Sequence, residues 1–167
     1  GANGQWESTQ ISGDGSSSIT VWGWSFPGRE VWHSPLAQFP GRNDNHPTIG
    51  LLHCDRDQTD SHYAPVSTRE LSGTVLDAWL LGHIHQPDTL GISQPFGYLG
   101  SVVGLDAGES GARGPWLIEW QEGLLHRFEQ RPLGPIRWER IEVDITNVAS
   151  AAEIEGRIAD SLEALSL

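Results

Sequence analysis

Residues 77–85 read Asp-Ala-Trp-Leu-Leu-Gly-His-Ile-His, and this stretch decides the fold class. The segment Asp77 to Gly82 is short, with an apolar centre between polar residues, as in a strand buried inside a sheet. A similar pattern, Thr48-Ile-Gly-Leu-Leu-His53, lies about thirty residues upstream. Between the two, Ser67-Thr-Arg-Glu70 is a capping box that predicts the start of a short helix. We therefore expect an α/β fold with a largely buried sheet.

Further strands are predicted on both sides of this stretch. Ile19 to Trp24 is an apolar-rich strand, and Tyr98 to Gly100 is a brief one. A short connection containing Gly123 separates two apolar runs and predicts a hairpin over residues 116–120 and 124–128. Residues 1–17 read as a polar lead-in. The tryptophans on these strand patterns are expected in the core: Trp22, Trp24, Trp79, Trp116 and Trp120.

The C-terminal region follows a proline-rich linker, Arg131 to Pro135. Residues 136–143 predict a last strand. Ser150 and Glu153 form a second capping box, and apolar residues follow it at helical spacing. We expect this amphipathic helix to pack on its own sheet, with a surface for a partner protein as the alternative.

Charge and cysteine content exclude several classes of protein. The 167 residues hold 22 acidic side chains and 10 arginines but no lysine, which gives a net charge of −12. This negative charge argues against binding of the chain to nucleic acid phosphates without help from cations. It does not exclude a metal-dependent phosphoesterase, because the bound cations add local positive charge. The single Cys54 excludes an internal disulfide, and a reducing cytoplasm is the expected location. No apolar stretch is long enough to span a membrane.

Three histidines follow the two buried strands. His53 ends the first strand, and His83 and His85 lie just past the end of the second. Ligand-binding groups gather in loops at strand ends, and imidazole is a common ligand of divalent metals. We predict that His53, His83 and His85 bind metal, the alternative being that they are incidental surface residues. Cys54 is expected to be a small buried side chain, with a soft metal ligand as the alternative.

The histidine motifs resemble those of a known enzyme superfamily. Gly82-His83-Ile84-His85 is similar to the Gly-His-x-His signature of calcineurin-like metallophosphoesterases, and Leu51-Leu52-His53 resembles their preceding single-histidine motif. From about Ile19 to Asp144, segments such as VWGWSFPGRE, DAWLLGHIHQPDTL and RWERIEVDIT follow the order seen in SbcD/YhaO-type DNA repair exonucleases. The resemblance implies the C-terminal half of a four-layer sandwich over residues 1–134, with a mostly buried mixed sheet and flanking helices. Residues 135–167 would begin a truncated cap that contacts DNA.

The resemblance also implies roles for individual residues. His53 and His83 would bind one metal of a two-metal site and His85 the other. Manganese is the metal implied by the nuclease branch, and the two cations would clamp a phosphodiester for in-line attack. Apart from the resemblance, His62 is a candidate for lining the substrate groove, the alternative being a loop histidine that makes local hydrogen bonds. Arg113 would contact a phosphate or, alternatively, pair with Glu109. DNA as substrate and an SMC-like ATPase as partner are further implications.

Half of the superfamily's site lacks a counterpart in this sequence. The N-terminal Asp-x-His, the Gly-Asp motif that bridges the metals and the Gly-Asn-His-Asp/Glu motif are missing from their places. The start at Gly1-Ala2, without methionine, fits a piece of a longer protein. We therefore expect this chain alone to be inactive and to bind at most one ion weakly, with its catalytic residues unknown.

An open sheet edge would need a covering partner. We expect this to be the N-terminal half of the domain, a homodimer or a swapped assembly. The alternative function is a catalytically inactive interaction or scaffold module of the same fold, which the acidic charge balance favours slightly.

Overall fold

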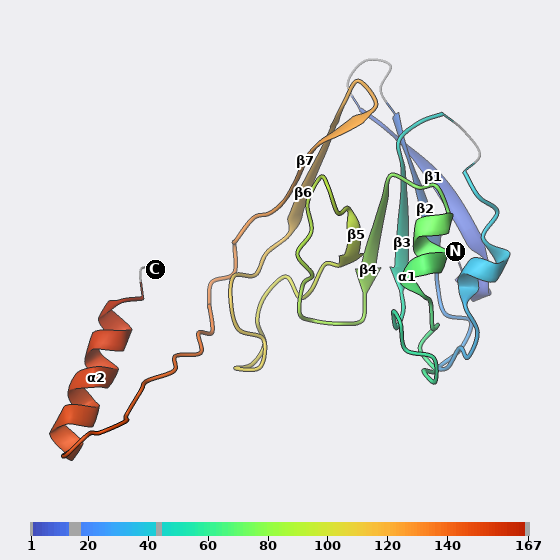
Figure 1. The fold of residues 1–167 in the computed structure, drawn as a ribbon. Helices are drawn as coiled ribbons and strands as arrows, with labels where there is room; N and C mark the ends of the chain where they lie inside the picture. The colour runs from blue at the N-terminus through green and yellow to red at the C-terminus, as the bar shows by residue number, and fades with distance from the viewer. Residues whose placement is uncertain (1, 14–17, 43–44, 166–167) are drawn as a thin grey trace.

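The computed structural model describes residues 2–13, 18–42 and 45–165. A five-stranded mixed sheet in the order β1-β2-β3-β4-β5 forms its body (Figure 1). The first two strands are antiparallel and the other neighbours are parallel. The strands are β1 (Trp6–Ser12), β2 (Ser18–Trp24), β3 (Thr48–His53), β4 (Ala78–Gly82) and β5 (Phe96–Tyr98). The α/β fold predicted from the sequence is confirmed.

Strand β1 is the main departure in the N-terminal region. Residues 1–17 were expected to be a polar lead-in, but Trp6 to Ser12 pair along the whole of β2. All of β1 except Trp6 is exposed, because it lies at the edge of the sheet. Its side chains therefore carry no alternation of apolar and polar residues, and backbone pairing alone defines the strand.

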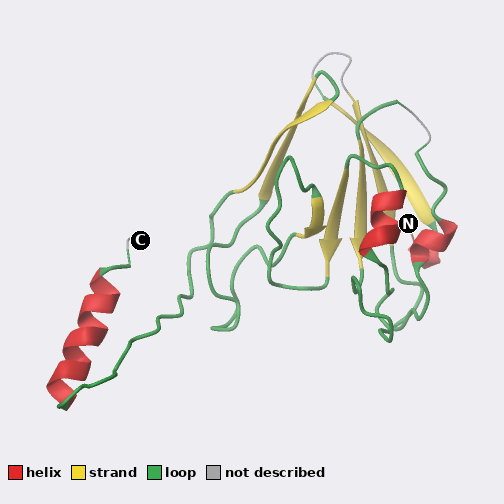
Figure 2. Ribbon diagram, viewed as in Figure 1, coloured by secondary structure: helices red, strands yellow, loops and turns green. Residues whose placement is uncertain are grey.

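Short helical elements cover one face of the sheet. The capping box at the start of α1 (Thr68–Gly73) is confirmed: Ser67 Oγ accepts from Glu70 N at 3.1 Å, and the Glu70 carboxylate accepts from Ser67 N at 2.7 Å. Two 3-10 turns, η1 (Ala2–Gly4) and η2 (Pro35–Gln38), are also present. Figure 2 shows η2 near α1, and side chains from both pack into the same core cluster.

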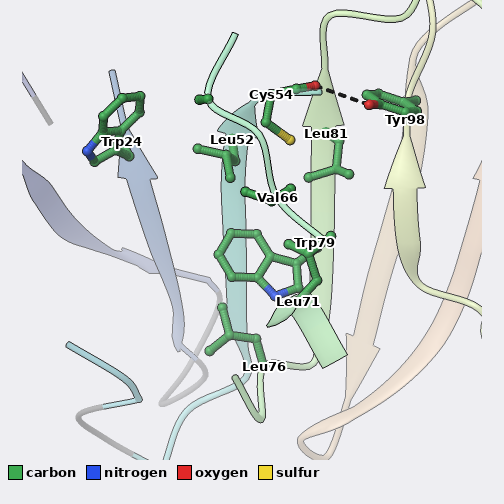
Figure 3. Close-up of a cluster of buried hydrophobic side chains, with 10 residues drawn as sticks. Trp24, Leu52, Cys54, Val66, Leu71, Leu76, Trp79, Leu81 and Tyr98 are labelled. Carbon is green, nitrogen blue, oxygen red and sulfur yellow. Dashed lines mark hydrogen bonds between the residues drawn. The ribbon is translucent and has the colours of Figure 1, made fainter. Parts of the chain in front are cut away.

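The core lies between these helical elements and the sheet (Figure 3). Trp79 is at its centre with 0% exposure, and its indole Nε1 donates to Thr74 Oγ1 at 2.8 Å. Gly50 on the neighbouring strand leaves the room that this ring needs, since a Cβ there would lie 2.2 Å from two ring carbons. Trp22 and Trp24 are buried as predicted, whereas Trp116 and Trp120 are only half-buried.

The predicted hairpin is confirmed as a separate two-stranded sheet, β6 (Trp116–Gln121) and β7 (Leu124–Gln130). Phe128 is buried against the ring of Trp116, with the ring centroids 5.3 Å apart. The indole Nε1 of Trp116 donates to the carbonyl of Leu99 at 2.8 Å. That bond ties the hairpin to the segment that follows β5.

Two expectations for the C-terminal region are wrong. Residues 136–143 form no strand, because this segment finds no neighbouring strand to pair with; its contacts include a bond from Trp138 Nε1 to the carbonyl of Gly104 at 3.2 Å. Helix α2 (Ala151–Glu163) forms and is capped by Ser150, but none of its residues is buried. It lies apart from the sheet rather than packing on it (Figure 1). That residues 135–167 begin a cap stays a prediction.

Among the described residues, no helix is both long enough and apolar enough to cross a membrane.

Candidate metal centre

The candidate centre lies at the carboxyl ends of β3 and β4. The two strands are parallel and His53 pairs in register with Gly82, so His53 and the following His83 emerge at the same level of the sheet. Gly82 suits this arrangement because a Cβ there would lie 3.1 Å from His53 Nδ1. His83 has a φ of 109°, a backbone conformation that L side chains rarely adopt. Such local strain is typical of residues held for function.

The nitrogen atoms of His53 and His83 face each other. His53 Nε2 lies 3.2 Å from His83 Nδ1, and the ring centroids are 5.1 Å apart. Two imidazoles on one tetrahedral zinc ion, with Zn–N bonds of about 2.0–2.1 Å, place their nitrogens roughly 3.3 Å apart. The observed separation therefore suits two ligands of a single ion.

Two carboxylates contact His83 and His85, the two histidines of the Gly-His-x-His motif. His83 Nε2 lies 3.1 Å from Asp55 Oδ1, and His85 Nδ1 contacts Glu109 Oε1. A hydrogen on His83 Nε2, held by Asp55, leaves the Nδ1 lone pair directed at His53. The same logic leaves Nε2 of His85 free of a hydrogen. Carboxylates in this position orient metal-binding histidines and select their tautomer.

Sequence reasoning missed both carboxylates as parts of the site. Asp55 carries a weak signal, since it follows the His53 motif by two residues in a polar run. Glu109 lies 24 residues beyond His85 in a glycine-rich loop, where spacing gives no indication that the two side chains meet.

The local electrostatics favour the neutral form of His53. Burial lowers its pKa, the charges of His83 and His85 lower it further, and Asp55 opposes them. A neutral imidazole is the form that binds metal. The pKa of Glu109 is lowered by a hydrogen bond from Leu105 N and by its contact with His85.

Arg113 is buried and forms hydrogen bonds within the protein, between the loop that carries His85 and the glycine-rich loop. It is only 3% exposed, and its guanidinium donates to the His85 carbonyl, to Gln86 Oε1 at 2.7 Å and to the Ser110 carbonyl at 3.0 Å. Towards Glu109 it donates to the backbone carbonyl and not to the carboxylate. Arg113 thus fastens the histidine loop to the glycine-rich loop, and its phosphate contact stays a prediction.

Cys54 and His62 belong to the polar segment that follows β3 and differ in burial. Cys54 is 0% exposed, and burial raises the pKa of its thiol to about 12, so the expected small buried cysteine is confirmed. His62 lines a cavity of about 570 Å³ beside Asp55 and Tyr63. The structure therefore places His62 near Asp55 of the candidate centre. Among the described residues, no hydrogen bond joins His62 to His53, His83 or His85.

The donor set fits part of a metal site. Within residues 2–13, 18–42 and 45–165, no group of three or more His, Cys, Asp or Glu side chains is arranged to hold a metal ion. Two imidazole nitrogens converge, and two carboxylates orient the signature histidines. Among the described residues, two imidazole nitrogens thus have a spacing that suits one ion, and a complete site would need further ligands from outside this arrangement.

Comparison with known proteins gives one informative similarity. No protein-family model matches the chain. The chain is 24% identical over 155 residues to the "Uncharacterized metallophosphoesterase YhaO" of Bacillus subtilis (strain 168), an alignment that covers 91% of this chain and 38% of the relative. The chain thus spans about two fifths of the length of the curated relative it matches. The mixed α/β sheet fits part of a metallophosphoesterase fold, and the similarity supports a relation to the calcineurin-like metallophosphoesterase superfamily.

Proposed function

We propose that this chain provides the three-histidine part of a metal-dependent phosphoester hydrolase that acts on the phosphodiester bonds of DNA as an exonuclease. The observation that carries the proposal is the 3.2 Å approach of His53 Nε2 and His83 Nδ1 at the carboxyl edge of a parallel sheet. The similarity to a metallophosphoesterase supports the same chemistry.

Each residue of the centre has a distinct task. His53 and His83 would hold one divalent ion, proposed to be manganese, and His85 would present Nε2 to a second. Asp55 and Glu109 keep His83 and His85 in the tautomers that leave those nitrogens unprotonated. When bound, the ions neutralise charge on the phosphoryl oxygens. They also offset the net charge of −12, which by itself would repel DNA.

The chain would act together with a segment that carries the three missing motifs. Parallel sheets are normally covered on both faces. Leu52 points into the core, whereas Leu51, on the opposite face of β3, is 42% exposed. We propose that the N-terminal half of the domain covers this face and completes the metal site. A homodimer or a swapped assembly is the alternative cover, and an SMC-like ATPase would join the complete protein.

The test measures manganese-dependent cleavage of single- and double-stranded DNA by the chain alone and by the chain mixed with a segment carrying the missing motifs. We expect cleavage only in the mixture, and its loss with His83→Ala. His126→Ala is the matched control, since His126 is an exposed histidine on β7. Cleavage that survives His83→Ala would refute the assignment.

The second candidate is an inactive interaction module, and the incomplete ligand set of the described residues favours it. In that case the contact between His53 and His83 is an ordinary hydrogen bond, in which His53 Nε2–H donates to His83 Nδ1. Tight binding of the segment without any turnover would support this function over hydrolysis.

A further inference from the structure

The hydroxyl of Tyr98 is bonded to the backbone on both sides of Asp55. Arg56 N donates to Tyr98 Oη at 2.6 Å, and Tyr98 Oη donates to the carbonyl of Cys54 at 3.1 Å (Figure 3). A phenolic hydroxyl donates and accepts at once, so a single atom holds the two peptide groups that flank one residue. That residue is Asp55, whose carboxylate contacts His83.

Tyr98 is buried, and its hydroxyl keeps the proton that it donates. The residue is 5% exposed, and burial raises the pKa of Tyr98 to about 12. At neutral pH the hydroxyl is therefore protonated and available to the Cys54 carbonyl. Both bonds matter more than their direct contribution, because a buried polar group that loses its partner finds no replacement.

Tyr98 also holds the loop that follows β4. Its backbone N donates to Asp88 Oδ2 at 2.7 Å, and Asp88 N donates to the Tyr98 carbonyl at 3.0 Å. Arg56 joins the two loops directly, with Nη1 2.9 Å from Asp88 Oδ2. Asp55 lies on the loop after β3 and His83 on the loop after β4, so both partners of the contact are connected to this one residue of β5.

The contact between Asp55 and His83 tolerates little movement. Asp55 Oδ1 lies 3.1 Å from His83 Nε2, and a shift of about half an ångström would take the pair out of hydrogen-bond range. The backbone of Asp55 itself is bonded on its other edge, where Asp55 N donates to the Tyr63 carbonyl at 2.8 Å and Val66 N donates to the Asp55 carbonyl at 2.9 Å. The Tyr98 hydroxyl is thus the side-chain group that fixes this segment from the side of β5.

We propose that Tyr98 is a positioning residue, whose hydroxyl holds the Asp55 carboxylate against His83. The contact keeps the hydrogen of His83 on Nε2 and leaves the Nδ1 lone pair directed at His53. This tautomer is a property of the chain by itself, whereas its use in metal binding rests on the proposed function. A purely structural role in the core cluster, to which Tyr98 also belongs, would affect stability and leave the tautomer unchanged.

The first test uses Tyr98→Phe, which keeps the ring in the core and removes only the hydroxyl. The readout is the ¹⁵N NMR spectrum of the imidazoles in the metal-free full chain at about pH 8.5, where ordinary imidazoles are neutral. We expect the Nε2–H tautomer of His83 in the wild type and a mixture of both tautomers in Tyr98→Phe.

Thr74→Val is the matched control, because it removes the hydroxyl that accepts from the buried Trp79 Nε1 at 2.8 Å, and Thr74 lies at the end of α1. The His83 tautomer should be unchanged in this variant. An unchanged His83 spectrum in Tyr98→Phe, or the same change in Thr74→Val, would overturn the proposal.

The second test is a double-mutant cycle on Zn²⁺ affinity. Tyr98→Phe should weaken zinc binding by about two- to tenfold in the wild type and by less than about twofold in Asp55→Asn. The reason is that Asp55→Asn already removes the carboxylate that Tyr98 positions. Equal effects in the two backgrounds would refute the route through Asp55.

A measurement on the unsubstituted chain covers the case in which Tyr98→Phe fails to fold. The Arg56 amide should exchange with solvent at least about tenfold more slowly than an unprotected amide, because it donates to Tyr98, and exchange at the unprotected rate would overturn the proposal. Tautomer and exchange are measured without metal or turnover, so either result can stand when DNA cleavage fails and fail when cleavage stands. Wild-type zinc binding no tighter than that of His83→Ala would count against the proposed function and leave the tautomer result intact.

Discussion

Replacing Asp55 by Asn tests whether the carboxylate contact prepares His83 for metal binding. Asp55 Oδ1 lies 3.1 Å from His83 Nε2, and its other oxygen accepts from Ser61 Oγ. An Asn side chain retains the size and one acceptor but removes the negative charge. The His83 tautomer that directs Nδ1 at His53 should then be less favoured, and a metal ion should bind more weakly.

The contact geometry sets the size of the effect. Hydrogen bonds to charged groups contribute about 1.5–3 kcal/mol. The His83 and Asp55 side chains are 24% and 15% exposed, so solvent screening places this pair at the lower end. About 1.5 kcal/mol corresponds to roughly a tenfold change in the dissociation constant. Removing the hydrogen-bond partner of a metal-binding histidine typically lowers metal affinity by about 10–100-fold, and the tenfold value lies at the lower end of that range.

The assay is competition for Zn²⁺ between the chain and a chromophoric chelator at neutral pH. Zinc is the probe because imidazole binds it well. Asp60→Asn is the control, since it removes the same charge from the same cavity wall and Asp60 is exposed. Ser61→Ala removes only the hydrogen bond from Ser61 Oγ to Asp55, so it measures how much of the effect of Asp55→Asn comes from that second contact. A dissociation constant for Asp55→Asn within about twofold of the wild type, with an unchanged circular dichroism spectrum, would refute the reasoning.

Two further predictions concern stability. Gly50→Ala would place a Cβ 2.2 Å from ring carbons of the fully buried Trp79. We expect this substitution to lower the free energy of unfolding by about 1–3 kcal/mol and Tm by about 2–12 °C. Gly73→Ala, whose Cβ would meet nothing within 4 Å, is the control, and an equal Tm for both variants would contradict the packing argument. Asp57 accepts from Thr68 N and Oγ1 at 2.7 and 2.6 Å, which holds its pKa below the usual 3.8. Its stabilisation is therefore present above pH 3.8 and lost as the pH falls through the lower, folded-state pKa. In urea denaturation, Asp57→Asn should cost about 0.5–1 kcal/mol at pH 7 and progressively less as the pH falls below 3.8, and a cost that does not fall with pH would count against this account.

Elements with a strong local signal were predictable from the sequence. Strand β3 is found at Thr48–His53 as predicted, and the capping box of Ser67 and Glu70 begins α1 where expected. Strand β1 and residues 136–143 were mispredicted for opposite reasons. β1 has a neighbour to pair with but no apolar pattern, whereas residues 136–143 have the pattern but no neighbour.

The sequence alone determined the candidate ligands and the position of two of them, because His53 and His83 each follow a short apolar strand and parallel strands bring such ends to one edge. It could not determine which groups complete the surroundings of these ligands. The contacts of Asp55 with His83 and of Glu109 with His85, the burial of Arg113 and the hydrogen bonds of the Tyr98 hydroxyl all join residues whose chain separation has no fixed period. Local patterns encode contacts within one strand or one helical turn, whereas these contacts depend on how separate loops pack above the sheet.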